Sequence, residues 1–293
     1  MLILGCLGDP APQRDEPWHL GSEWNSGWYH NSAAALLDDD RVIAAVEEER
    51  LTRRKHSGKF PFRAIEACLA AAGVSLADVD RIAFGERGGD GPYRDPRISA
   101  ERIAAVLHSH FPGQNDLLPK IRLVEHHVGH ALSAFVPSRF EHALVFSCDG
   151  FGDGISALVA IGRDGRIERT LDTFSFADSL GRFYSSTLDF LGYGSGDEYK
   201  VMGLAPYGDP SVHRELFQSF YELLPEGRFR IAFHEQKAMT AALAKIAPKR
   251  DRGGAFLREH EHVAAAIQEA FERIVFHVLT HWQQRTGERH LCL

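Results

Sequence analysis

The same order of strands occurs twice along this chain, and this repeat constrains the fold more than any other feature. Each half opens with a buried strand, continues into a polar or glycine-rich stretch and two further strands, and then turns helical. We expect these strands at 2–7, 32–37 and 41–47 in the first half, and at 143–148, 155–161 and 167–174 in the second. A repeat of this kind indicates internal duplication. The sequence therefore predicts an α/β protein with two similar lobes, 1–138 and 139–293, divided near 137–141.

The remaining segments fit between these strands. A stretch rich in Pro, Gly and Trp, 9–29, reads as an insertion. Apolar spacing predicts helices at 61–72, 98–110, 179–191, 211–224, 236–247 and 256–286, and short strands at 81–84, 120–124 and 289–293.

Composition excludes some classes of protein. The 293 residues carry a formal net charge of -7, which gives no electrostatic reason to expect a nucleic acid partner. No apolar run approaches the roughly 20 residues that a helix needs to cross a membrane. The four cysteines are far apart and no secretory leader is visible, so we expect free thiols and a cytoplasmic protein.

Two histidines, His126 and His130, follow the strand-like run 120–124 at helical i,i+4 spacing. On a helix they share one face and can hold one divalent metal between them. With 16 histidines in the chain such pairs also arise by chance, and His277 with His281 is a second one. A catalytic metal normally needs a third protein ligand, often a carboxylate.

Three other segments contain residues suited to chemistry. The segment 149–154 holds Asp149, Gly150 and Gly152, which can approach a phosphate and its cation or simply form a tight acidic hairpin. His30, just before a strand, is either a general base or a loop histidine. Lys200 is the single charge in an apolar, glycine-rich run, and it either binds an anionic acyl phosphate or lies on the surface at a helix start.

Five motifs in register resemble the O-carbamoyltransferases of nodulation-factor and antibiotic biosynthesis, and the resemblance covers nearly the whole chain. The motifs are HNSAAALL (30–37), VEEER with RRKH (46–50 and 53–56), HHVGHA (126–131), DGFG (149–152) and YKVMGLA (199–205). The resemblance implies an actin-like ATPase fold of duplicated lobes, related to the tRNA threonylcarbamoyl transferase.

The resemblance also implies a reaction. In that family a C-terminal domain makes carbamoyl adenylate from carbamoyl phosphate and ATP, and the N-terminal region passes the carbamoyl group to a hydroxyl of a small molecule. Carried over by motif, His126 and His130 are ligands of iron or another divalent metal, and His30 is the base near the acceptor. Asp149, Gly150 and Gly152 line the nucleotide, and Lys200 is an active-site contact.

Two departures from the family qualify this expectation. The insertion 9–29 is longer than the family's first loop, and 289–293 matches a strand that in the family precedes an Ala-Gly-Gly loop. We therefore expect an incomplete second lobe, a metal-binding aspartate and an adenylate-forming domain beyond residue 293, and a chain that is inactive alone.

The alternatives are a non-catalytic subunit that needs a complementary chain, in cis or in trans, and a relative of the tRNA-modifying enzyme. A homodimer is a further arrangement open to the chain. The sequence identifies neither the acceptor nor the metal.

Overall fold

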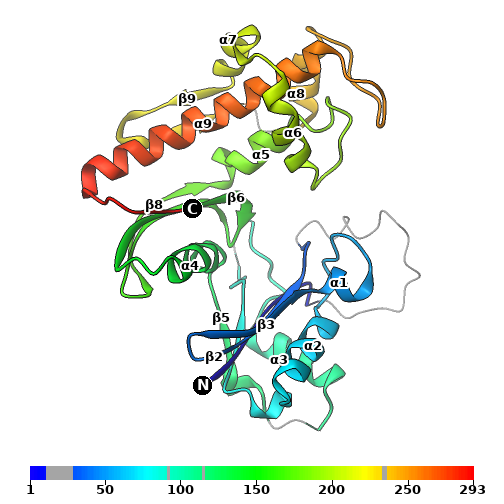
Figure 1. Cartoon of the computed structure of the whole chain (residues 1–293), viewed down its shortest axis with the longest axis vertical. Helices are drawn as coiled ribbons and strands as arrows, with labels where there is room; N and C mark the ends of the chain where they lie inside the picture. The colour runs from blue at the N-terminus through cyan, green and yellow to red at the C-terminus, as the bar shows by residue number, and fades with distance from the viewer. Residues whose placement is uncertain (11–28, 91–92, 114–115, 233–235) are drawn as a thin grey trace. The chain divides into compact units, whose positions relative to one another are not determined.

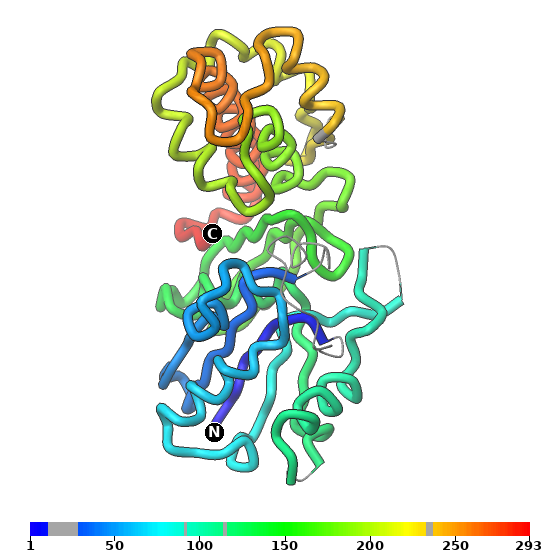
Figure 2. Tube along the Cα trace, turned by 90° about the vertical axis from the view of Figure 1, so that its right-hand side faces the viewer, coloured from blue at the N-terminus to red at the C-terminus, as the bar shows by residue number. Residues whose placement is uncertain are grey.

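The computed structural model describes residues 1–10, 29–90, 93–113, 116–232 and 236–293. The chain forms two compact units, 1–129 and 130–293 (Figures 1 and 2). The units divide inside a helix, whereas we expected a division near 137–141. Apart from its two ends, the predicted insertion lies outside the described residues.

The first unit is built on a five-stranded sheet with the order β3-β2-β1-β4-β5. Its strands are β1 (Leu2–Leu7), β2 (Ala33–Asp38), β3 (Arg41–Glu47), β4 (Arg81–Phe84) and β5 (Ile121–Leu123). Strand β1 pairs antiparallel with β2 on one side and parallel with β4 on the other. Alternate residues such as Leu4 and Leu36 are fully buried, as expected for strands with one face on a core.

Helices pack against this sheet. They are α1 (Glu48–Thr52), α2 (Phe62–Ala72) and α3 (Ala100–His110), with short 3-10 helices η2 (Leu76–Asp78) and η3 (Leu118–Lys120). Helix α2 contacts β2 and β3 and ends at Gly73, whose φ of +66° closes the helix as predicted. At its other end the buried carboxylate of Glu48 accepts the Ala64 N–H at 2.8 Å, where a negative charge suits the helix dipole.

The second unit repeats the strand arrangement of the first. Its main sheet has the order β11-β6-β7-β8, formed by β6 (His142–Gly152), β7 (Ile155–Arg163), β8 (Arg166–Ser175) and β11 (Leu291–Cys292). Strand β6 pairs antiparallel with β7 and parallel with β11, as β1 does with β2 and β4. The predicted class, α/β with two similar lobes, is confirmed by this shared order.

Helices form most of the rest of the second unit. They are α4 (His126–Ser138), which begins before the boundary, α5 (Leu180–Ser185), α6 (Glu198–Leu204), α7 (Arg214–Gln218), α8 (Gln236–Leu243) and α9 (Arg258–Thr286), with 3-10 helices η4 (Phe176–Asp178), η5 (Ala205–Tyr207), η6 (Pro210–Val212) and η7 (Pro225–Gly227). The long helix α9 lies beside α5, α6 and α7 (Figure 1). It buries an apolar stripe through Val263, Ile267, Ile274 and Val278.

Three local predictions were wrong. The segment 211–224 is not one helix, because β9 (Tyr221–Leu223) pairs antiparallel with β10 (Phe229–Ile231). The segment 149–154 is mostly strand, because β6 runs to Gly152 and the turn contracts to Asp153 and Gly154, both with positive φ. An Asp-Gly pair suits such a two-residue hairpin turn. In 179–191, α5 ends at Ser185 and hydrogen-bonded turns follow.

Among the described residues, no helix is long and apolar enough to span a bilayer.

Candidate metal centre

Helix α4 carries three histidines in its first two turns, and the residue before it fixes where it begins. The Glu125 carboxylate accepts the Val128 N–H at 2.7 Å, which caps the N-terminus of the helix. Further along, Ala131 and Phe135 are buried in a small apolar core with β6 and β7. Because the helix is continuous, this packing also holds its first turn, which bears His126 and His127.

Asp149 lies on β6 at a break in the pairing with β7, between Cys148 and Gly152. Irregularities of this kind often aim a side chain at a functional site. The Ser179 hydroxyl lies 3.1 Å from the carbonyl oxygen of Asp149 and 2.6 Å from that of Gly150. Ser179 also caps α5 by accepting the Arg182 N–H. The main chain that carries Asp149 is therefore tied to the start of α5.

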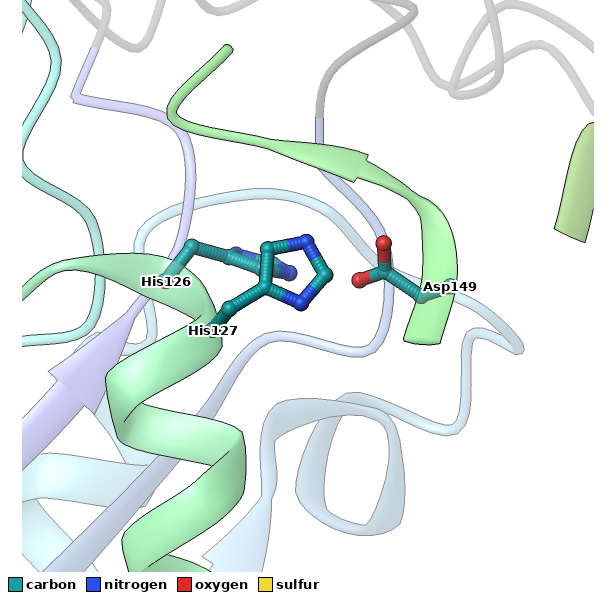
Figure 3. Close-up of side chains that lie close together, drawn as sticks. All are labelled: His126, His127 and Asp149. Atoms are coloured by element: carbon teal, nitrogen blue, oxygen red, sulfur yellow. The ribbon is translucent and has the colours of Figure 1, made fainter. Parts of the chain in front are cut away.

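The side chains of His126, His127 and Asp149 come together (Figure 3). One ligand atom from each lies within 4.8 Å of the others, and the two rings and the carboxylate point toward one another. His127 is fully buried, whereas His126 and Asp149 are half-buried. Two imidazoles and a carboxylate are donors that zinc and iron accept. The residues present therefore fit a divalent transition metal.

His130 approaches the same carboxylate from the next turn of the helix. Its Nε2 lies 3.6 Å from Oδ2 of Asp149, too long for a hydrogen bond, and its side chain is 54% exposed. The helix-face pair predicted from the sequence, His126 and His130, thus has a carboxylate close by within this chain. We expected the carboxylate beyond residue 293 and assigned Asp149 to the nucleotide. The ligand roles themselves stay predictions.

The thiol of the neighbouring Cys148 is protonated at neutral pH. Burial, with a smaller contribution from the charge on Asp149, raises the pKa of Cys148 to about 12. Since a thiol binds metal or attacks carbon as the thiolate, Cys148 is held in its unreactive form.

Lys200 lies on α6 and contacts Asp197. Its Nζ is 2.6 Å from Oδ1 of Asp197, and Oδ2 of the same carboxylate accepts the Gly194 N–H at 3.0 Å. The bond to Asp197 raises the pKa of Lys200, so the side chain stays cationic. Lys200 therefore anchors the turn before α6, and its predicted contact with an anionic ligand stays a prediction.

His30 lies before β2 in the first unit, where its Nδ1 is 3.2 Å from Oδ1 of Asn31. Gly150 and Gly152 are in β6, and their predicted place beside a nucleotide stays a prediction. The second i,i+4 pair has a structural contact, because His277 Nε2 lies 2.8 Å from the carbonyl oxygen of Leu224.

Sequence reasoning missed several residues of the centre. Helical i,i+4 spacing selected His126 and His130 and passed over His127, because adjacent residues point in different directions along most of a helix. At the first turn, however, a ligand atom of each ring lies within 4.8 Å of one from Asp149. Ser179, at the start of α5, supports the main chain at Asp149 and Gly150. It left no local signal in the sequence because its hydrogen bonds join segments about 30 residues apart.

Known proteins resemble the chain over most of its length. The family described as carbamoyltransferase N-terminus matches residues 25–97 and 98–293. The nodulation protein NolNO of Sinorhizobium fredii is 43% identical over 83% of this chain and 37% of its own. NolO of Bradyrhizobium diazoefficiens is 49% identical over 58% of this chain and 30% of its own, and the uncharacterized Synechocystis protein sll1178 is 31% identical over 92% and 49%. The chain thus spans only about a third to a half of these relatives.

Solved structures show weaker similarity. YeaZ from Pseudomonas aeruginosa matches with a TM-score of 0.36 and 15% identity, over 60% of this chain and 68% of that one. Component A of the (R)-2-hydroxyglutaryl-CoA dehydratase of Acidaminococcus fermentans matches with a TM-score of 0.47 and 12% identity, over 99% and 91%. Scores this low carry no argument about the chain. The family match covers nearly the whole sequence, and it shows that this chain belongs to the carbamoyltransferase N-terminus family.

Proposed function

We propose that this chain is the metal- and acceptor-binding part of an O-carbamoyltransferase. The full enzyme would transfer a carbamoyl group from carbamoyl adenylate, made from carbamoyl phosphate and ATP, to a hydroxyl of a saccharide or secondary metabolite. Family membership supports the group transferred. The names of two relatives, both nodulation proteins, favour an acceptor connected with nodulation.

The chemistry assigns a role to each candidate residue. His126 and Asp149, together with His127 or His130, would hold the metal, with iron as the first candidate. When bound, the metal would supply a Lewis acid that polarises the carbamoyl carbonyl. His30 accepts the proton of the acceptor hydroxyl as its oxygen forms a bond to the carbamoyl carbon, and the bond from that carbon to the adenylate oxygen breaks to release AMP. Lys200 and the backbone at Gly150 and Gly152 contact the phosphate.

The single observation that carries the proposal is the convergence of His126, His127 and Asp149. Its direct test is metal binding by the purified chain, measured by titration with Fe²⁺ under anaerobic conditions and with Zn²⁺. We expect one metal per chain, and loss of binding in His126→Gln and Asp149→Asn.

A matched control comes from the second histidine pair. His281→Gln removes an imidazole from an i,i+4 pair on α9, where His277 bonds a carbonyl, and binding should not change. If wild-type chain binds no metal, or if the His281 variant loses it as fully as the Asp149 variant, the assigned centre is wrong.

Carbamoyl transfer is tested separately, with a protein that also contains the C-terminal domain that the family resemblance implies. That region would act in cis, or in trans as a complementary chain. Mixing the separately made parts distinguishes these cases. Transfer to a hydroxyl acceptor by the mixture indicates action in trans, and transfer by the joined protein alone indicates action in cis. Tight, salt-sensitive tRNA binding would instead favour the tRNA-modifying alternative.

A further inference from the structure

Asn31 lies between two histidine rings in the first unit. Its Oδ1 is 3.2 Å from Nδ1 of His30 and 3.2 Å from Nδ1 of His56. On its other side, the Asn31 amide nitrogen lies 3.4 Å from Oε1 of Glu47. One side-chain amide therefore joins the candidate base to a second histidine, which is 25 residues from Asn31 along the chain.

The contact with Glu47 determines which way this amide faces. An ionised carboxylate only accepts hydrogen bonds, so the amide NH₂ must point toward Glu47 and the carbonyl oxygen toward the rings. A carbonyl oxygen has two lone pairs and can accept from both rings. Both Nδ1 atoms must then carry hydrogen, and in a neutral imidazole the basic nitrogen is the other one, Nε2.

The surroundings hold this arrangement in place. Glu47 is bound from behind by Arg50, whose Nε donates to Oε2 at 3.2 Å. The His56 backbone N–H donates to Oε2 of Glu49 at 2.8 Å. Asn31 and His56 both have positive φ, of 54° and 57°. Asparagine tolerates this conformation better than most residues with a side chain. Position 31 therefore suits asparagine both for its side-chain amide and for its backbone conformation.

We infer that Asn31 is a positioning residue that holds His30 and His56 in the Nδ1–H tautomer, which makes Nε2 the basic nitrogen of both rings. The tautomers are inferred from the two contacts with Asn31 Oδ1. Their use rests on the proposed function, in which His30 takes the proton of the acceptor hydroxyl at Nε2. His56 then adds a second imidazole, with the same protonation, to the acceptor side of that reaction.

The tautomers can be measured directly in this chain. Long-range ¹⁵N–¹H spectra of the ¹⁵N-histidine protein distinguish a protonated from an unprotonated ring nitrogen, and His30→Gln and His56→Gln assign the two rings. Above neutral pH we expect unprotonated Nε2 and protonated Nδ1 in both. Spectra showing Nε2–H in either ring would overturn the inference.

Asn31→Gly is the decisive variant, because glycine keeps the positive φ and removes only the side chain. Both rings should shift toward the Nε2–H form, with the rest of the spectrum unchanged. Asn31→Asp keeps an acceptor, so both rings should stay Nδ1–H. Unchanged rings in the Gly variant contradict the inference, and if that variant fails to fold, wild type and the Asp variant still decide.

In the full enzyme, Asn31→Gly should lower kcat by up to about 10²-fold, the lower end of what general base catalysis contributes, because His30 itself remains, and it should change KM for the acceptor little. Asn31→Asp should restore part of that loss. If the tautomers are as expected and no carbamoyl transfer occurs, the proposed function fails while this inference stands. If transfer occurs but Asn31→Gly leaves kcat and its pH profile unchanged, the positioning role is wrong.

Discussion

Gly181 lies against the peptide that joins Asp149 to Gly150, and only glycine fits there. A β-carbon at position 181 would be 2.4 Å from the carbonyl carbon of Asp149 and 2.5 Å from the backbone nitrogen of Gly150. These are main-chain atoms, which cannot swing aside as the end of a side chain can. The start of α5 therefore determines where the candidate metal-binding carboxylate is held.

Gly181→Ala should consequently destabilise the chain and weaken metal binding. Overpacking of this kind typically lowers the free energy of unfolding by about 1–3 kcal/mol, and any shift of β6 displaces Asp149 from the histidines. Denaturant unfolding and metal titration measure the two effects. Gly203→Ala is the control, because Gly203 lies on α6 with no atom near its would-be β-carbon, and it should keep or slightly raise stability. A Gly181→Ala chain as stable as wild type would contradict the packing argument.

The identity of the third metal ligand separates two arrangements. Both use His126 and Asp149, so His126→Gln and Asp149→Asn should each lower metal affinity by more than tenfold. In the arrangement of Figure 3, His127→Gln does the same and His130→Gln has a smaller effect. The helix-face pair predicts the reverse, and paired titrations of these two variants decide between them.

Acid should weaken the first unit through Glu49. This carboxylate is only 5% exposed, and its bonds to the His56 N–H and to Lys55 lower its pKa. A lowered folded-state pKa stabilises the fold above the ordinary value, near 4.3, and this contribution is lost as pH falls through the folded pKa. Glu49→Gln should therefore cost about 1–3 kcal/mol at pH 7 and progressively less below pH 4.

Unfolding curves of wild type and Glu49→Gln across pH measure this difference. The exposed pair of Glu222 with Arg230 supplies the control, because Glu222→Gln should change stability by less than about 0.5 kcal/mol at any pH. A gap between wild type and Glu49→Gln that stays constant into acid would show that the loss is not electrostatic.

Local signals predicted the parts of this fold that depend on neighbours in sequence. The apolar run of β1 and the stop at Gly73 are examples, since each follows from a few consecutive residues. The β9 strand was missed because it is stabilised by pairing with β10. This pairing outweighs the helical spacing of the apolar residues in 211–224.

The candidate site also contains some residues that the sequence pattern predicted and others that it did not. His126 and His130 were visible as a spaced pair, and His30 as a histidine before a strand. The partners that orient these rings were not visible, because Asn31 meets His56, and Asp149 meets His127, only after the chain has folded. Side-chain partnerships between distant segments leave no periodic trace in the sequence.

The cysteines next to these elements should be inert in the native chain. All four are free, and burial raises the pKa of Cys6 and Cys148 to about 12. Because the thiolate is the reactive form, a disulfide reagent at pH 8 should label native protein slowly and all four thiols rapidly after denaturation. Lys237→Cys, at an exposed position on α8, should add one fast-reacting thiol and confirm that the reagent works.

Rapid native labelling of Cys148 would instead mean that this thiol ionises beside Asp149. Cys148→Ser would then be expected to weaken metal binding, whereas a protonated bystander predicts unchanged affinity.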